Sequence, residues 1–260
     1  MHSKAFTLIE LLVVIAIIAV LMAVLMPALK LAKDQAHAII CTNNMRTLAL
    51  AWLLYKDDYD ARLVGGYPSR SSTPSDAWMK PPQGLSTDTV ERQLEGIRQG
   101  LLFPYTKKVT VYRCPGDWRM KKADQLAYGS YSVAGGLNGE EKEWTSGKLH
   151  IERYTDIKNP ALKFVFVEES DPRGWNMGSW VVNHLPSNSW IDPVAVWHNK
   201  RSCLSWADGH ADKHKWVDNS TMEVALRAAW NLGNVFNQSP PAGEGEDLKF
   251  MQRGYQLRGQ

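Results

Sequence analysis

The 260-residue chain is poor in cysteine and nearly balanced in charge. Its three cysteines exclude a disulfide-dense small protein and a zinc site built from four thiolates of one chain. Thirty basic and 27 acidic side chains leave a net charge of +3, too small to indicate a nucleic-acid-binding protein. The chain has no internal repeat, and its 44% hydrophobic content is sufficient for a packed core. We therefore expect one or two globular units and no nucleic-acid partner.

Sequence fingerprints of enzymes are also missing. There is no Gly-x-Ser-x-Gly elbow, His-Glu-x-x-His motif, P-loop or Rossmann glycine pattern. Glu168, Glu169 and Asp171 form an acidic cluster at the end of an expected strand. Adjacent acids on a strand point to opposite faces, which disfavours a paired-carboxylate glycosidase. We expect no enzymatic activity and no cofactor.

Charged side chains are absent from Leu11 to Leu29, and no tryptophan precedes Trp52 although the chain has 11. As a helix, this apolar run is about 28 Å long, close to the thickness of the bilayer core. A secretory signal peptide cleaved after residues 36–38 and a plain signal anchor are two alternatives. Neither explains Glu10, because a lone carboxylate beside such a run is costly in lipid unless it has a partner.

The residues that lead to the apolar run, Lys4-Ala5-Phe6-Thr7-Leu8-Ile9-Glu10, resemble the class III leader of type IV pilins and type II secretion pseudopilins. In that family a membrane peptidase cuts before the Phe and methylates the new amino terminus. The resemblance implies cleavage between Ala5 and Phe6, and N-methylation of Phe6. It also implies that Glu10 neutralises the α-ammonium of a neighbouring subunit during assembly. Ala5 departs from the family, which usually has Gly before the cut.

Two further features extend the expected helix. Pro27 lies near the end of the apolar run, where pilins often carry proline, and should kink or locally melt the helix. Beyond Lys30 apolar side chains recur at steps of three and four, which predicts the second half of the same helix packed on a globular part. The residues of this stripe are Ala38, Cys41, Met45, Leu48, Trp52, Tyr55 and Tyr59.

The rest of the chain predicts short strands and helices. Asp208-Gly209 indicates a tight hairpin turn, and residues 220–223 read as a capping box that opens a helix ending at Gly233. A further helix is expected from Thr89 to Phe103, with Asp88 as its N-cap. The expected strands are Val109–Arg113, Lys163–Glu168, Trp180–Asn183, Val194–Trp197, Ser202–Trp206 and His210–Val217.

Three motifs in the globular part resemble a second family, a prepilin-type group named for a His, nine residues and then Asp-Gly. They begin at Cys41 (Cys-Thr-Asn-Asn-Met-Arg-Thr-Leu), at Val111 (Val-Tyr-Arg-Cys-Pro-Gly-Asp) and at His198, which nine residues separate from Asp208-Gly209. The resemblance extends to about Val217 and concerns fold and assembly more than activity. We also expect His198 to hydrogen-bond near the Asp208 turn.

The cysteines within these motifs admit two arrangements. Outside the cytoplasm, a disulfide between Cys41 and Cys114 would fasten the helix to the sheet, whereas the alternative is two buried free thiols. We favour the disulfide. Cys203 alternates with its neighbours in a short strand and is expected to be a small core residue.

Two other sets of side chains offer weaker binding hypotheses. His210, Asp212 and His214 occupy every second position of a strand and could hold a divalent metal, but a solvated edge strand is the preferred interpretation. We therefore expect no metal. Aromatic side chains at Trp175, Trp180 and Trp190 could bind sugars if exposed, whereas core positions are the simpler interpretation for most of them.

We expect an α+β, pilin-like fold in which the long helix packs on an antiparallel sheet. Its parts are a leader peptide (1–5), a transmembrane and assembly helix (6–29), the amphipathic second half of the helix (30–59), a periplasmic or extracellular globular domain (60–239) and a weakly ordered tail (240–260).

The resemblances imply a structural subunit of a type IV pilus-like or type II secretion pseudopilus filament. The expected partners are other pilin or pseudopilin subunits, the prepilin peptidase, an inner-membrane assembly platform and membrane lipid. The expected location is the bacterial inner membrane, crossed once with the C-terminal domain outside the cytoplasm, and then a periplasmic or surface filament. The alternative function is a minor pilin-like or membrane-anchored module whose Trp-rich face binds polysaccharide or another extracellular ligand.

Overall fold

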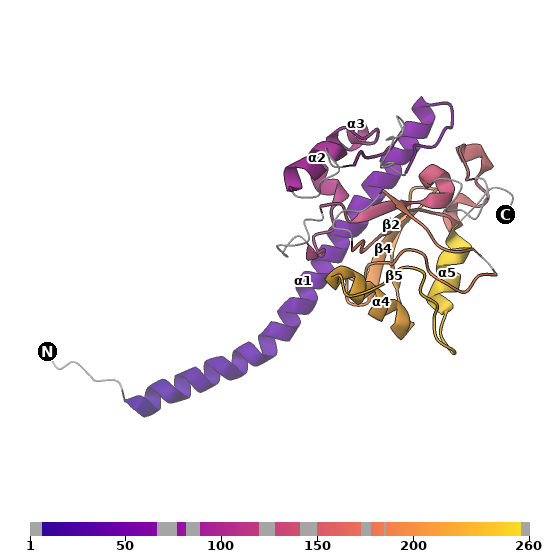
Figure 1. Cartoon of the computed structure of the whole chain (residues 1–260). Helices are drawn as coiled ribbons and strands as arrows, with labels where there is room; N and C mark the ends of the chain where they lie inside the picture. The colour runs from indigo at the N-terminus through magenta and orange to yellow at the C-terminus, as the bar shows by residue number, and fades with distance from the viewer. Residues whose placement is uncertain are drawn as a thin grey trace.

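The computed structural model describes residues 7–66, 77–81, 89–119, 128–140, 150–172, 178–184 and 186–255. Its largest element is one helix, α1 (Leu8–Asp58), which begins well away from the globular part and then runs along it (Figure 1). Both halves follow from the sequence, because the first is uniformly apolar and the second has an apolar stripe. The predicted long helix is confirmed.

The second half of α1 buries one face against the globular part. Six of the seven predicted stripe residues are buried, and Tyr59 is 47% exposed because it lies at the C-cap, where the helix has ended. Tyr59 stacks on Tyr55 with a centroid separation of 4.2 Å. The buried residues of α1 are Ala38, Cys41, Met45, Leu48, Ala49, Ala51, Trp52 and Tyr55.

Pro27 lies inside α1, which is continuous through this residue. The chain is therefore not locally melted there, since the helix extends many residues to either side. Figure 1 shows a curved rod in the half that precedes the globular part. A sharp kink centred on Pro27 stays a prediction.

A five-stranded sheet in the order β3-β1-β2-β4-β5 forms the centre of the globular part. The strands are β1 (Tyr131–Ala134), β2 (Phe164–Glu168), β3 (Ser179–Trp180), β4 (Arg201–Trp206) and β5 (Ala211–Lys215). The pairs β1–β2, β2–β4 and β4–β5 are antiparallel, whereas β1 and β3 are parallel. The fold is α+β and pilin-like in architecture, with a mixed sheet in place of the antiparallel sheet expected.

The sheet is covered on both faces. On one side α1 packs against β2, β4 and β5, and the buried face of α1 joins a core cluster with Val165 and Cys203 of the sheet. On the other side α5 (Glu246–Gly254) contributes to a second cluster that includes Phe164 and Leu204. The second half of α1 and the sheet therefore share one hydrophobic core.

The predicted hairpin at Asp208-Gly209 is confirmed. It joins β4 to β5 through residues 207–210, and the Trp206 amide donates to the His210 carbonyl at 3.0 Å. Gly209 has φ of +94°, and a Cβ there would come within 2.9 Å of Leu53 Cδ1 on α1. Glycine is required both by the backbone conformation and by the close packing of the turn on α1.

Two predicted strands are wrong. Val109–Tyr112 forms a 3-10 helix, η2, in contact with α1, and residues 194–197 are irregular apart from a bridge between Val194 and Glu169. Their β-branched and aromatic residues fit buried positions in general. In η2 this property serves packing against α1, whereas Val194 is buried in the cluster on the other face of the sheet. Strand β1 was not anticipated, and β3 is shorter than the predicted Trp180–Asn183.

The helices also differ from expectation at their ends. Helix α2 (Val90–Arg98) is shorter than predicted and has Thr89, not Asp88, as its N-cap. Helix α4 (Asn219–Trp230) begins after Asp218, ahead of the predicted capping box, and has Asn231 at its C-cap. The remaining short elements are α3 (Phe103–Thr106), η4 (Gly135–Gly139), η5 (Tyr154–Asp156) and η6 (Pro160–Leu162).

Helix α5 lies where the sequence suggested a weakly ordered tail. Its Leu248 and Met251 are buried, as is Tyr255 at the C-cap. Asp218 and Asp247 brace its start reciprocally: Asp218 Oδ2 accepts from the Asp247 amide at 2.9 Å, and Asp247 Oδ2 accepts from the Asp218 amide at 2.8 Å. The amphipathic helix α5 follows a polar run and is short, so the sequence alone does not indicate it. It is stable because tertiary packing buries its apolar face.

His214 on β5 should make folding sensitive to acid. Burial lowers the pKa of its imidazole to about 4, and its ring stacks on Phe250 at 3.7 Å between centroids. The unfolded chain takes up this proton first as pH falls below about 6.5, so His214 should lower the free energy of unfolding between pH 6.5 and 4. The ring is only half-buried and solvent screens it, so the expected loss is about 1 kcal/mol. His214→Phe should keep the ring stack and flatten the dependence of Tm on pH in this interval. Equal slopes in the two proteins would contradict the assignment.

Candidate functional site

The N-terminal turn of α1 carries the first candidate site. Thr7 is the N-cap, and its Oγ1 accepts a hydrogen bond from the Glu10 amide at 3.3 Å. In return, Glu10 Oε2 accepts from the Thr7 amide at 2.9 Å and from Thr7 Oγ1 at 2.7 Å. This capping box holds the carboxylate at the positive end of the helix dipole, on the exposed first turn. The predicted cleavage residues Ala5 and Phe6 lie outside the described residues.

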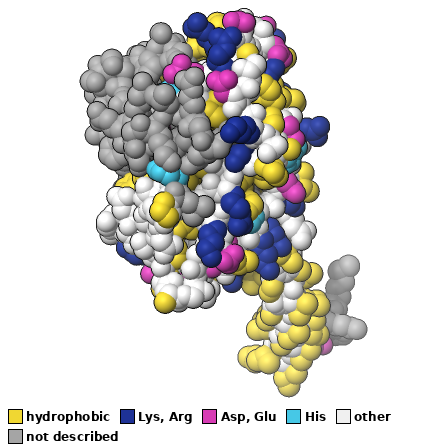
Figure 2. Space-filling model, turned by 90° about the vertical axis from the view of Figure 1, so that its right-hand side faces the viewer, with side chains coloured by type: hydrophobic (Ala, Val, Ile, Leu, Met, Phe, Trp, Pro, Cys, Tyr) yellow, Lys and Arg dark blue, Asp and Glu magenta, His cyan; other side chains and the backbone are white. Residues whose placement is uncertain are grey.

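The first half of α1 presents an exposed apolar surface. Figure 2 shows its hydrophobic side chains gathered around the rod below the globular part. The most apolar 18-residue window of α1 has a mean hydropathy of 3.2 and is not buried by the rest of the chain. An apolar surface of this extent marks a site of contact with lipid or with other proteins. The helix is long and apolar enough to cross a membrane.

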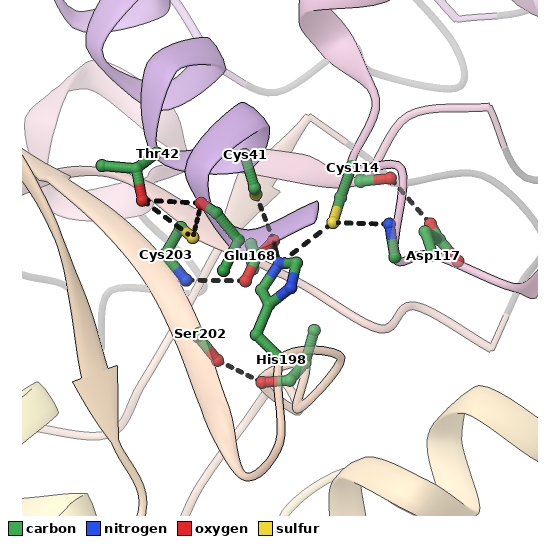
Figure 3. Close-up of polar contacts among 12 residues, drawn as sticks. Cys41, Thr42, Cys114, Asp117, Glu168, His198, Ser202 and Cys203 are labelled. Atoms are coloured by element: carbon green, nitrogen blue, oxygen red, sulfur yellow. Dashed lines mark hydrogen bonds and ion pairs between the residues drawn. The ribbon is translucent and has the colours of Figure 1, made fainter. Parts of the chain in front are cut away.

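A second candidate site lies inside the globular part, where four segments meet (Figure 3). Cys41 comes from α1, Cys114 from the turn after η2, Glu168 from the end of β2 and His198 from the loop before β4. All four side chains are buried, and their sulfur, oxygen and nitrogen ligand atoms lie within 4.8 Å of one another. We refer to Cys41, Cys114, Glu168 and His198 as the thiol–histidine cluster.

Hydrogen bonds connect the members of the thiol–histidine cluster. His198 Nε2 lies 3.0 Å from Glu168 Oε1 and 3.1 Å from Cys114 Sγ. The Cys41 thiol donates to Glu168 Oε1 at 2.5 Å, so this one oxygen is shared by a thiol and an imidazole. The four groups are therefore aimed at a common point.

Neighbouring donors fix the orientation of the cluster. The Gly116 amide donates to Cys114 Sγ at 3.3 Å, and the Cys203 amide donates to Glu168 Oε2 at 2.6 Å. The Tyr131 hydroxyl lies 3.1 Å from Cys41 Sγ. A Cβ at Gly116 would come within 3.0 Å of His198 Cε1, so glycine in the Cys-Pro-Gly-Asp turn lets the imidazole approach. These contacts hold the side chains in place before anything binds.

The electrostatics of the cluster follow from burial and from the Glu168 carboxylate. Burial raises the pKa of the Cys41 thiol well above its usual value, and the nearby cysteines and Glu168 raise it further. Burial by itself lowers the pKa of His198, but Glu168 and the hydrogen bonds to Cys114 and Cys203 together outweigh burial, and the net pKa is raised. When no metal ion is bound, Cys41 is therefore a neutral thiol, and His198 is an imidazolium paired with Glu168.

The structure brings Cys41 and Cys114 together, as the sequence suggested, but not as a disulfide. Both are buried free thiols, which was the alternative arrangement. Their sulfur atoms contact the other members of the cluster: Cys41 contacts Glu168, and Cys114 contacts His198. Cys203 is buried as expected, with its sulfur 3.4 Å from Thr42 Oγ1.

The weaker metal hypothesis on β5 is not supported by the described part of the chain. His210 stacks on Trp206 and pairs with Asp208 at 2.5 Å, whereas His214 stacks on Phe250. The two imidazoles therefore contact different aromatic rings and do not converge on one metal site. Among the described residues, the group whose ligand atoms lie close enough together to hold a metal ion is the thiol–histidine cluster.

The expectation that His198 bonds near the Asp208 turn is wrong. His198 contacts Glu168 and Cys114, whereas Asp208 Oδ1 accepts from the His210 amide at 3.1 Å in the hairpin turn. The two ends of the nine-residue spacing therefore have different structural roles. His198 belongs to the buried cluster, and Asp208-Gly209 forms the hairpin turn that packs on α1.

The Trp-rich face is also not formed as hypothesised. Trp180 and Trp190 are both buried, with ring centroids 6.4 Å apart in an edge-to-face arrangement, and Trp175 lies outside the described residues. The two described rings are core residues and are not available for stacking on a sugar.

Glu168 is the functional residue that sequence reasoning missed. It closes the apolar strand Phe-Val-Phe-Val-Glu, all five residues of which are buried. A carboxylate that ends such a strand must be paired or bound when buried, and this was the available signal. Its partners lie at least 30 positions away in the sequence, which is why spacing rules did not find them.

Together these features define a protein with a pilin-like α+β architecture, anchored in the membrane by its N-terminal helix. A family model for the prokaryotic N-terminal methylation motif matches residues 1–26. The match supports a type IV pilin-like precursor. No curated protein and no solved structure matched the chain.

Proposed function

We propose that this chain is the precursor of a structural subunit of a filament, either a type IV pilus-like fibre or a type II secretion pseudopilus. The observation that carries the proposal is the exposed first half of α1, which is free of charge from Leu11 to Leu29 and lies mostly within the methylation motif matched at residues 1–26. Glu10 stands immediately before this charge-free run. Before assembly, lipid covers this surface. In a filament, the same surface of neighbouring subunits would replace the lipid, and the role of the chain would be structural and not catalytic.

The charges at the start of α1 support a role in assembly. Glu10 is the one acidic residue in the first turn, and it is followed by apolar residues up to Lys30. Cleavage before Phe6 would create a new ammonium group four residues from Glu10. Within one subunit the Glu10 carboxylate is already engaged by Thr7. A second subunit's ammonium would complete its pairing in the membrane interior, where unpaired charges are costly.

The proposal places the protein in the bacterial inner membrane, with residues beyond α1's first half outside the cytoplasm. Its partners would be the prepilin peptidase, an inner-membrane assembly platform and other pilin-like subunits. The burial of Trp180 and Trp190 leaves the alternative of a sugar-binding Trp face without support from the described residues.

The leader should be removed in cells that contain a prepilin peptidase. Intact-mass and N-terminal peptide analysis of the membrane fraction should find a chain that begins at Phe6 and carries one added methyl group. Ala5→Gly, which restores the usual family residue, should be processed at least as completely. A chain that retains Met1, or one that begins at Ile39 after signal-type cleavage, would contradict the pilin interpretation.

A further inference from the structure

We propose that Cys41, Cys114, Glu168 and His198 bind a zinc ion that fastens α1 to the globular domain. The inference goes beyond the filament role, since it concerns how one subunit is held together. It stands on the position and chemistry of four buried side chains from four separate segments.

The geometry is close to that of a tetrahedral site. Zinc–sulfur bonds of about 2.3 Å and zinc–nitrogen or zinc–oxygen bonds of about 2.0–2.2 Å place ligand atoms about 3.3–3.8 Å apart. In the cluster, Glu168 Oε1 lies 2.5 Å from Cys41 Sγ and 3.0 Å from His198 Nε2. His198 Nε2 lies 3.1 Å from Cys114 Sγ, and all four ligand atoms lie within 4.8 Å of one another. Small outward shifts of the side chains would open the centre to the ion.

The donor set favours zinc. Two thiolates and one imidazole suit a borderline-soft cation, and a carboxylate oxygen completes four-coordination. Mg²⁺ and Ca²⁺ prefer oxygen ligands and would not use the two sulfurs. Four protein ligands, all buried, describe a closed structural site without an open position for a substrate.

Donors around the cluster suit a bound cation with anionic ligands. Two thiolates and a carboxylate carry three negative charges, of which a divalent ion balances two. The Gly116 amide and the Tyr131 hydroxyl lie against the sulfurs of Cys114 and Cys41 respectively, where they can share the remaining charge. Metal binding would displace the protons now shared among the thiols, Glu168 and His198.

A disulfide accounts for less of the site. It would use the two sulfurs and leave Glu168 and His198 as a buried charged pair, with both desolvation costs still present. Zinc uses all four groups and explains why the carboxylate and the imidazole converge on the same point as the thiols.

The position of the site gives the ion a mechanical role. Cys41 lies at the first buried turns of α1, where the helix passes from its exposed half into the core. The other three ligands come from the loop after η2, from the central strand β2 and from the loop before β4. Zinc would therefore join the helix to the globular domain at the junction that carries load between them.

A groove offers a route for the ion. It has a volume of about 410 Å³ and is lined by α1 residues including Asp34 and Ala38, by Arg201 and Lys213 of the hairpin, and by His198. His198 is 2% exposed and thus forms part of the groove wall and part of the buried cluster.

The test uses the full-length chain purified in detergent under reducing conditions, without chelator. Elemental analysis should find one zinc per chain, and replacement by Co²⁺ should give tetrahedral d–d bands with a thiolate charge-transfer band. Chelation should lower Tm by roughly 10 °C or more, and added zinc should restore it. Glu168→Gln and His198→Asn should each reduce retained zinc at least tenfold. The matched control is His210→Asn, which removes an imidazole that pairs with Asp208 outside the cluster and should leave one zinc bound.

Three results would overturn the proposal. The first is a folded wild-type protein that contains no zinc and does not take up Co²⁺, a measurement that does not depend on any variant folding. The second is a Cys41–Cys114 disulfide in protein isolated from cells under non-reducing conditions. The third is zinc retained equally by Glu168→Gln, His198→Asn and wild type.

Discussion

Replacing Glu10 with alanine should abolish filaments while the processed protein still accumulates in the inner membrane. The substitution removes a carboxylate from the membrane-embedded turn, so insertion becomes easier. It leaves a neighbour's ammonium unpaired in low dielectric at a cost of several kcal/mol for each subunit, repeated along the filament. Cell fractionation, shearing of surface filaments and N-terminal mass analysis would measure the three steps separately. The Tm of the globular domain should not change, because Glu10 lies on the exposed first turn.

Thr7→Ala is the matched control for this experiment. Thr7 provides the other half of the capping box, so its loss weakens the start of α1 by about 1 kcal/mol but leaves the Glu10 carboxylate in place. Filaments should persist in Thr7→Ala. Filaments at wild-type abundance in Glu10→Ala would refute the assembly role, and loss of filaments in both processed variants would assign the effect to the helix cap.

Replacing Asp117 with alanine should destabilise the globular domain by about 3 kcal/mol, because it removes the hydrogen-bonded carboxylate with the largest charge interaction on the buried Arg119 guanidinium, although Asp171 and Glu169 still act on it. Arg119 is fully buried, and its Nη2 lies 2.7 Å from Asp117 Oδ2. Nη2 also donates to the Gly129 carbonyl and Nη1 donates to the Asp171 carbonyl, each at 2.9 Å. The expected fall in Tm is roughly 10 °C, measured by near-UV circular dichroism on the eleven tryptophans.

Two further variants separate the charge effect from general damage. Asp117→Ala combined with Arg119→Met removes both charges of the pair and should recover part of the lost stability, because a buried pair replaced by apolar groups is often near neutral. The recovery is incomplete because Asp171 and Glu169 lose the same cation. Arg98→Met breaks an exposed pair with Glu91, whose atoms lie 2.7 Å apart, and should leave Tm almost unchanged because solvent screens the pair. A small effect of Asp117→Ala, comparable to that of Arg98→Met, would contradict the assignment.

The Asp117–Arg119 pair and the thiol–histidine cluster share one short stretch of chain. Cys114 supplies a ligand atom, Gly116 allows the imidazole to approach, and Asp117 neutralises Arg119. The Cys-Pro-Gly-Asp turn thus serves two buried polar groups at once. Its first and last residues, Cys114 and Asp117, are accordingly buried, whereas Pro115 and Gly116 between them are partly exposed.

Local physical chemistry made the first part of this protein readable from sequence. The absence of charge between Leu11 and Leu29 required an apolar environment, and steps of three and four residues set the buried face of α1. The tight turn at Gly209 followed from its need for positive φ. Each of these features depends on residues a few positions apart, which is the range over which helix periodicity and turn conformation act.

The tertiary structure alone decided the rest. Cys41 and Glu168 are 127 positions apart, and Glu168 and His198 are 30 apart, so no local pattern could indicate that they meet. The parallel pairing of β1 with β3 and the docking of α5 likewise depended on which surfaces remained to be covered once α1 had packed on the sheet. A buried polar group is stable only where hydrogen-bonding or charged partners surround it. These partners come from distant segments, so only the folded chain brings them together.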